Sequence, residues 1–223
     1  MKLSSQHPLT AALATALALA VLAPVAHAQQ QASSPTMREQ RAKRMAELGN
    51  AKDAVKEQEA KPAVYPNATR VSPEAKSSGK MTKNLQALQA LYEKPDMAGV
   101  VAKADEIAAM PAASAYDKSF AYSLAGNAAA DQDDQAKAAE YFRKAVEANG
   151  LDNDSHYATM YNQAVILFGL EKYADALATM DRFLAETKSE KPEQQAFRAG
   201  LLANLGRNDE AAAVYRELIA KNP

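Results

Sequence analysis

The chain has 223 residues, 48% of them hydrophobic and 6% aromatic, and 26 Lys and Arg against 27 Asp and Glu leave a net charge of −1. It contains no cysteine, which excludes disulfides, thiolate metal sites and a thiol nucleophile. Of its three histidines, His7 and His27 lie in a segment that we expect to be removed, and the remaining His156, which we expect to be exposed and inert, cannot form a metal cluster or a catalytic triad. The composition therefore predicts a non-catalytic, all-α protein with no cofactor and no metal, since abundant alanine favours helix.

The first 28 residues have the pattern of a secretory signal peptide. Lys2 gives a basic start, an apolar run covers residues 9–26, and Ala26-His27-Ala28 has the small-x-small form that signal peptidase cleaves. The alternative is an uncleaved membrane anchor, but the run is rich in alanine and barely long enough to span a bilayer. We therefore expect cleavage after Ala28 and export to a bacterial periplasm, which suits a chain without cysteine.

The residues that follow the signal peptide predict a tail instead of a folded domain. Residues 29–60 are polar, and between 37 and 60 the composition favours helix with few apolar side chains. A solvated, partly helical segment is favoured over a short coiled coil, because the Gly-Asn pair at 49–50 would interrupt the heptads. Residues 61–80 contain three prolines and a Ser-Ser-Gly sequence, which are typical of a linker.

Charge separates along the chain. Residues 29–80 carry 10 basic and 6 acidic side chains, a net of +4, whereas residues 81–223 carry 15 basic and 21 acidic side chains, a net of −6. Nucleic acid is therefore not expected as a partner, given the acidic second part and the export signal. The basic tail leaves peripheral contact with an anionic membrane as a weaker alternative, because its positive charges are interspersed with acidic ones.

Residues 81–223 repeat a helix–turn–helix pattern. Units 119–152, 157–190 and 192–223 share it, and 81–113 is a degenerate fourth unit. Each of the three has a small residue in its first helix, a small residue twelve positions later and a large residue four positions further on. We predict that the small residues let the two helices approach closely, while the large side chain fills the groove towards the next hairpin. The predicted packing residues are Gly126, Ala138, Phe142, Ala164, Ala176, Met180, Ala199, Ala211 and Tyr215.

This pattern resembles the tetratricopeptide repeat family, whose period is about 34 residues. The best-matching unit carries Tyr122, Gly126, Ala138, Phe142 and Ala145. Later units depart from the pattern at Phe183 and Leu218, where a small residue is usual. The resemblance covers nearly all of residues 81–223, and it implies a right-handed superhelix of about four stacked hairpins that binds partners on its concave face.

Local signals predict where these helices begin and end. Ser114, with Asp117 three residues later, has the spacing of a capping box. Further N-caps are predicted at Asp96, Asp134 and Asn208. We expect Asn149-Gly150 and Gly206 to end helices in the left-handed conformation, which glycine adopts most easily.

The resemblance places a partner-binding surface on the first helices of the units. Its candidate residues are Phe120, Ser123, Asn127, Tyr161, Asn162, Val165, Phe168 and Phe197. The set mixes aromatic and amide side chains and lacks the Lys and Arg of a carboxylate clamp, so it favours an extended or helical peptide held in aromatic pockets. The alternative is that Phe120, Val165 and Phe168 belong to the core between repeats.

These observations predict a scaffold or adaptor of the bacterial cell envelope that binds a protein or peptide partner. One alternative is an oligomeric subunit of an envelope complex, assembled through the N-terminal helix. A homo-oligomer could also form through the apolar edge of the last hairpin, which Val214, Leu218 and Ile219 would leave partly uncovered. A further alternative is the accessory domain of a longer cell-wall enzyme that is truncated at residue 223.

Overall fold

The computed structural model describes residues 62–74 and 76–221. The chain divides into two units, residues 1–35 and 36–223, and all described residues belong to the second. The predicted signal peptide and the helix or coiled coil predicted between residues 37 and 60 therefore lie outside the described residues.

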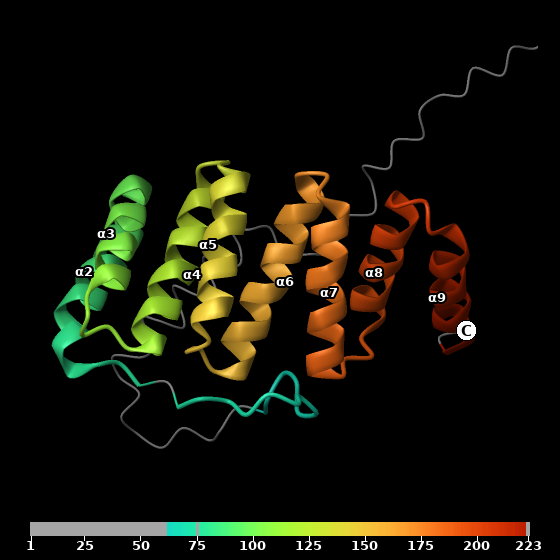
Figure 1. Ribbon diagram of the computed structural model, residues 1–223, viewed down its shortest axis with the longest axis horizontal. Coiled ribbons are helices and arrows are strands. Elements are labelled where there is room, and N and C mark those ends of the chain that lie inside the picture. The colour runs from blue at the N-terminus through green and yellow to red at the C-terminus, as the bar shows by residue number, and fades with distance from the viewer. Residues whose placement is uncertain (1–61, 75, 222–223) are drawn as a thin grey trace, which may run out of the picture. The chain divides into compact units, whose positions relative to one another are not determined.

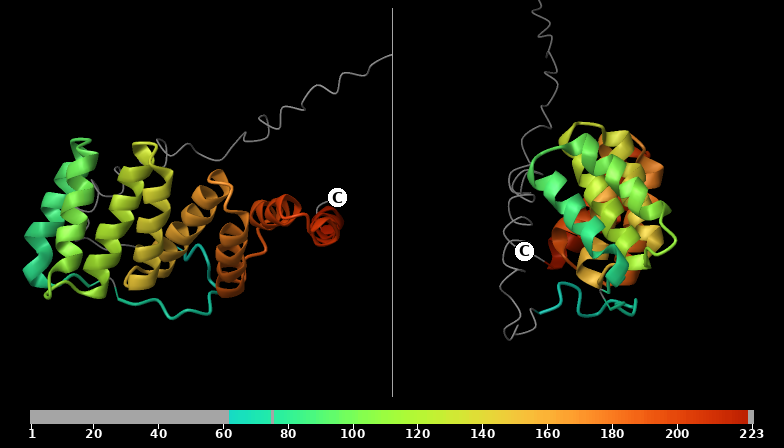
Figure 2. Two further views of the ribbon diagram at one scale, coloured as in Figure 1. Left: turned by 45° about the horizontal axis from the view of Figure 1, so that its top comes forward. Right: turned by 90° about the vertical axis from the view of Figure 1, so that its left-hand side faces the viewer.

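The described residues form eight α-helices and no strand. The helices are α2 (Thr82–Glu93), α3 (Met97–Ala109), α4 (Ala115–Asp131), α5 (Gln135–Ala148), α6 (Asn153–Gly169), α7 (Tyr173–Thr187), α8 (Pro192–Asn204) and α9 (Asn208–Lys221), and the short 3₁₀ helix η2 (Gly79–Met81) precedes them. Each helix packs against the next one in the chain, so that four hairpins follow one another in order (Figures 1 and 2). This confirms the predicted all-α fold of about four stacked hairpins. No helix in this part of the chain is both long and apolar enough to cross a membrane.

The core consists of two clusters that meet at α5. One cluster contains buried side chains from η2, α2, α3 and α4 together with Tyr141, and the other contains Phe142 and buried side chains from α4 to α9. Adjacent residues of α5 thus belong to different clusters. Alanine supplies many of the fully buried positions on α4, which allows the helices on either side to lie close to it.

Gly126 and Phe142 show what the small and large positions of the pattern do. A Cβ added to Gly126 would lie 2.5 Å from Cδ1 of Phe142, so the ring lies directly over the glycine of its own hairpin. Phe142 and Met180 are fully buried. The pattern predicted that the large side chain fills the groove towards the next hairpin, but the Phe142 ring covers the glycine of its own hairpin. Tyr215, the third large residue, is 41% exposed and does not fill a groove between hairpins.

Three of the four predicted N-caps are present, and the fourth residue, Asn208, lies one position inside its helix. Ser114 and Asp117 form a capping box, in which the Ser114 hydroxyl accepts from the Asp117 backbone N–H and the carboxylate accepts from Ser114 N–H. Asp96 and Asp134 accept from backbone N–H groups in the first turns of α3 and α5. Asn208 is the first residue of α9 instead of the residue before it.

Two glycines that were predicted to be left-handed have different roles. Gly206 has a φ of +72° after α8, as expected. At the end of α5, Asn149 is the left-handed residue, with a φ of 55°, and Gly150 is not. Glycine is required at 150 for another reason, because a Cβ there would collide with the backbone of Ala115 at the start of α4.

His156 is buried, so the expectation that it is exposed is wrong. Its exposed fraction is 0%, and its ring lies edge-on to Tyr157 with 5.4 Å between the centroids. Neither ring nitrogen has a hydrogen-bond partner. Burial, followed by the nearby Arg70 guanidinium, lowers the pKa of His156 to about 4. The side chain is therefore a neutral part of the core at neutral pH.

Residues 62–74 and 76–78, which we call the strap, cross the ends of three hairpins. The strap runs along the ends of the helices at which α4, α6 and α8 begin (Figure 1). At one end, Asp117 accepts hydrogen bonds from the Ser77 hydroxyl and from Ser78 N–H, at 2.7 and 3.1 Å. The proline-rich composition predicted a linker, but it contained no signal for these contacts.

Candidate peptide-binding surface

Three of the aromatic residues predicted to bind a partner come together between α6 and α8. The ring of Phe197 on α8 lies 5.8 Å from that of Tyr161 and 5.7 Å from that of Phe168, both on α6. Tyr173, at the start of α7, extends the series with its centroid 5.6 Å from Phe168. We call these four residues the aromatic row.

The aromatic row covers the core and also retains exposed surface. All four of its members are half-buried and pack against the cluster that contains Phe142. The ring of Tyr161 contacts the fully buried Phe183 at 5.6 Å. Val165, on the same helix, is 43% exposed. Phe168 can therefore belong to the core between repeats and also contribute to a binding surface.

Two predicted amide side chains hold polar groups without partners. Asn127 is only 5% exposed, and its Nδ2 has no acceptor; Nδ2 of Asn162 is likewise buried and unpaired. The hydroxyls of Ser123 on α4 and Thr159 on α6 lie 3.4 Å apart, which marks where the two helices face each other. Helical spacing places Asn127 one turn beyond Ser123 and Asn162 one turn beyond Thr159. Each unpaired amide costs about 1–3 kcal/mol, and because both Nδ2 atoms are buried they lie below the surface that a ligand would contact.

Phe120 does not join the aromatic row. It stacks on Tyr116, one turn earlier in α4, with 5.9 Å between the centroids. Both residues pack against the other core cluster, the one formed by the first hairpins. The eight predicted residues therefore divide into an aromatic part on α6 and α8 and a part on α4 that includes Phe120, Ser123 and Asn127.

The electrostatic environment of the row is acidic. Burial raises the pKa of the Tyr161 hydroxyl, and the nearby carboxylate of Glu193 and the hydroxyl of Tyr65 raise it further. Tyr161 therefore keeps its proton at neutral pH and can donate a hydrogen bond. This surface therefore suits an apolar peptide segment whose carbonyl group accepts from Tyr161 and that carries no carboxylate close to Glu193.

Sequence reasoning missed two tyrosines at this surface. Tyr173 is the first residue of α7. In the sequence it matches the repeat pattern at the start of a second helix, and this match does not indicate contact with Phe168. Tyr65 comes from the strap and contacts Phe183, which also touches Tyr161. Only its isolated position among prolines distinguishes Tyr65 in the sequence, and this indicates nothing about what it contacts.

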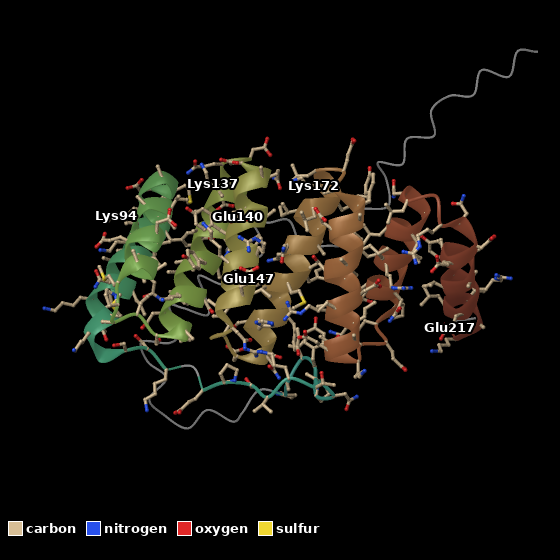
Figure 3. All side chains as sticks on the ribbon, in the orientation of Figure 1. Lys94, Lys137, Glu140, Glu147, Lys172 and Glu217 are labelled. Atoms are coloured by element: carbon tan, nitrogen blue, oxygen red, sulfur yellow. The ribbon has the colours of Figure 1, made fainter. Side chains whose placement is uncertain are left out.

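A polar depression lies beside the strap and contains no member of the aromatic row. This depression of about 550 Å³ lies between the strap, α5 and α7, and Arg70, Glu147 and Arg182 are among its lining residues. Two of its charges are in ion pairs, since Glu147 binds Arg143 and Arg182 binds Glu186, while Arg70 donates to neutral oxygens. Figure 3 shows Glu140 and Glu147 along the same helix, where both bind Arg143. Across residues 62–74 and 76–221, no three acidic, His or Cys side chains gather where they could hold a metal ion.

Comparison with known proteins finds one family. A family model for the tetratricopeptide repeat matches residues 123–191 and again residues 161–223. The two overlapping matches extend from the middle of α4 through α9 and include the whole aromatic row. No curated protein matches the chain.

Proposed function

Because residues 123–223 match these repeats twice, the chain is a tetratricopeptide repeat protein, and we propose that it is a non-catalytic scaffold whose aromatic row binds a segment of a partner protein. Such repeats generally mediate protein–protein interaction. They build a surface from stacked hairpins, and the specificity resides in the side chains on that surface.

The observation that carries this proposal is the aromatic row, whose half-buried rings cover the core and keep exposed surface. Aromatic rings that are half-buried and held by core contacts offer contact area at a low cost in conformational entropy. Val165, which is 43% exposed on the same helix as Tyr161 and Phe168, adds apolar surface on α6. The ligand that fits is an extended segment with apolar or aromatic side chains.

A peptide library selected against the wild-type chain tests the site. We expect selected peptides to lose at least about tenfold in affinity, or about 1.4 kcal/mol, when Phe168→Ala or Phe197→Ala shortens the row. Tyr215→Ala is the matched control, because it removes an aromatic ring that is exposed but lies outside the row. Far-ultraviolet circular dichroism checks that each variant remains helical. Selected peptides that bind both row variants as tightly as the wild type would contradict the proposal.

The proposed place of action is the bacterial periplasm, supported by the signal-peptide pattern of residues 1–28. Expression of the full chain in a bacterial host, followed by fractionation and mass measurement, tests this. We expect a periplasmic product that begins at Gln29. Replacing both Ala26 and Ala28 with a bulky residue is expected to block cleavage and serves as the control. A full-length product that remains in the cytoplasm would contradict the proposal.

A further inference from the structure

The strap inserts one aromatic side chain between α6, α7 and α8. The ring of Tyr65 lies edge-on to Tyr157 and Phe183, with centroid distances of 5.6 and 5.5 Å. Its hydroxyl accepts a hydrogen bond from Nε2 of Gln194 at 3.1 Å, and Nζ of Lys191 lies 4.9 Å from its ring centroid. We call Tyr157, Phe183, Lys191 and Gln194 the Tyr65 socket.

The backbone around Tyr65 is bound as a peptide ligand would be. Val64 N–H donates to Oδ1 of Asp154 at 3.1 Å, and Thr69 N–H donates to the carbonyl of Glu186 at 2.8 Å. Between them the chain turns, and Ala68 N–H donates to the carbonyl of Tyr65. Proline at 66, directly after the tyrosine, favours such a turn.

Arg70 provides a second anchor at the loop between α5 and α6. Its guanidinium donates to Oδ1 of Asn149 at 2.8 Å, to Oδ1 of Asn153 at 2.6 Å and to the carbonyl of Leu151 at 2.9 Å. In return, Nδ2 of Asn153 donates to the carbonyl of Arg70. These acceptors are neutral side-chain and backbone oxygens, so the loop recognises a guanidinium by its geometry instead of by an ion pair.

The remainder of this part of the strap contributes little. Val64 is 49% exposed and Val71 90% exposed, so attachment between residues 62 and 72 depends mainly on Tyr65 and Arg70. Backbone hydrogen bonds, the Thr69 and Ser72 hydroxyls and the packing of Ala68 add smaller contacts. The contacts of Ser77 and Ser78 with Asp117 lie beyond this stretch. Displacement of residues 62–72 would therefore leave the contacts at the far end of the strap in place.

The strap also leaves its socket incompletely satisfied. Gln194 is 6% exposed, and its Oε1 accepts no hydrogen bond although its Nε2 is bound to Tyr65. A buried acceptor without a donor is unfavourable, and a ligand with one more donor at this point would bind better than the strap. A partner segment that carries the same tyrosine and one more donor would therefore compete well with the strap for the socket.

We propose that the Tyr65 socket and the α5–α6 loop form a second peptide-binding site, specific for a tyrosine–proline turn followed by an arginine. Strap residues 64–70 are its intramolecular occupant, and a partner segment of the same chemistry displaces them. The strap therefore competes at the effective concentration of a tethered ligand, about millimolar, and weakens binding of the partner until it is displaced. This site adjoins the aromatic row through Phe183, which contacts both Tyr65 and Tyr161, but its socket contains no member of the row, and the proposal does not rest on the function proposed for the row.

A fluorescent peptide that corresponds to residues 62–72 tests the proposal in the full chain by fluorescence anisotropy. We expect saturable binding to the Tyr65→Ala/Arg70→Ala variant, and binding at least about tenfold weaker to the wild type, whose strap competes. A peptide in which the tyrosine is replaced by alanine should lose binding. Val71→Ala is the matched strap control, because Val71 is exposed, and it should behave like the wild type. Adding Phe168→Ala to the double variant should leave peptide binding unchanged, which separates this site from the aromatic row.

Two results would overturn the proposal. One is the absence of saturable binding to a double variant that circular dichroism shows to be helical, and the other is equal binding to the variant and the wild type. Hydrogen exchange of the wild type gives a test that needs no variant. With peptide in about millimolar excess, the Thr69 N–H that is bonded to Glu186 should exchange faster, and an unchanged rate would also overturn the proposal.

Discussion

The second and fourth hairpins follow the same sequence pattern but differ in how they are packed. α4–α5 lies between hairpins on both sides, whereas α8–α9 packs against α7 and has no described helix on its other side. At equivalent positions Phe142 is 0% exposed and Tyr215 is 41% exposed. A repeat pattern thus identifies the position of the large residue, and the presence of a neighbouring hairpin decides whether that residue is buried.

The comparison predicts the largest effect at the two large residues. Phe142→Ala should lower the free energy of unfolding by about 3–5 kcal/mol, because it leaves a cavity over Gly126. Tyr215→Ala should cost about 1 kcal/mol or less, because its ring is exposed. Urea unfolding followed by circular dichroism measures both. If both variants lost the same free energy of unfolding, the difference in burial between Phe142 and Tyr215 would have no effect on stability.

The glycines of α4 and α8 should respond with opposite signs. Gly126→Ala places a methyl group against the buried Phe142 ring and should cost about 1–3 kcal/mol. At Gly200 the nearest atom to an added Cβ is the Tyr215 hydroxyl oxygen, 4.0 Å away, so Gly200→Ala meets open space. It should stabilise the fold by about 0.5–1 kcal/mol through helix propensity. If the urea midpoints of Gly126→Ala and Gly200→Ala both rose or both fell, the predicted opposite effects of the two substitutions would be wrong.

The buried His156 should make stability depend on pH between about 6.5 and 4. Burial lowers its pKa to about 4 in the folded chain, whereas the ordinary value is 6.5, so only the unfolded chain gains the proton in this interval. Stability should therefore fall as the pH decreases, by about 3 kcal/mol in total, and should be nearly unaffected by this group well above pH 6.5. Unfolding curves at pH 7 and pH 4 measure the loss.

His156→Phe provides the control for that measurement, because it keeps an aromatic ring beside Tyr157 and removes the titration. Carboxylates that lose stability in acid, such as Asp117, are present in both proteins and cancel in the comparison. Although burial raises the pKa of Asp117, hydrogen bonds from Ser114, Ser77 and Ser78 outweigh it and lower the pKa. An identical pH dependence in wild type and variant would contradict the role of His156.

The smallest expected effect concerns the starts of α5 and α7. Asp134 caps α5, whereas Lys172 occupies the same position before α7 with no side-chain cap, although their backbones are similar (φ −86°, ψ 72° and φ −82°, ψ 59°). Figure 3 shows Lys137 and Lys172 at corresponding ends of these helices. Lys172→Asn should raise stability by about 0.5–1 kcal/mol, and Asp134→Ala should lower it by about 1 kcal/mol. Thermal unfolding detects both, and a destabilised Lys172→Asn would show that the two ends are not equivalent.

Several elements of the fold were predictable because their causes are local. The capping box of Ser114 and Asp117 needs only residues three apart in one helix, and it was predicted correctly. Small residues at Gly126 and Ala138 indicated close helices, although the ring that lies over Gly126 comes from Phe142. His156 was misjudged, because its burial depends on the surrounding α6 and α7 residues and on the strap.

The candidate surface was predictable only in part. Helical spacing and the repeat register placed Tyr161, Phe168 and Phe197 on the first helices, and the structure brings their rings into contact. The same register grouped Phe120 with them, but it packs in the other core cluster. Which aromatic residues touch depends on how one hairpin is rotated on the next, which the pattern within a single hairpin does not contain.

Periodicity, the spacing of small residues and the helix-capping residues were enough to establish an all-α repeat protein and to locate most of its helix ends. These features act between residues close in the chain, so they can be read without knowing the fold. The tertiary structure alone decided that the proline-rich strap is bound, that Tyr65 enters a socket more than ninety residues away, and that Tyr215 stays exposed. Those outcomes depend on contacts between distant segments, and no local pattern encodes such contacts.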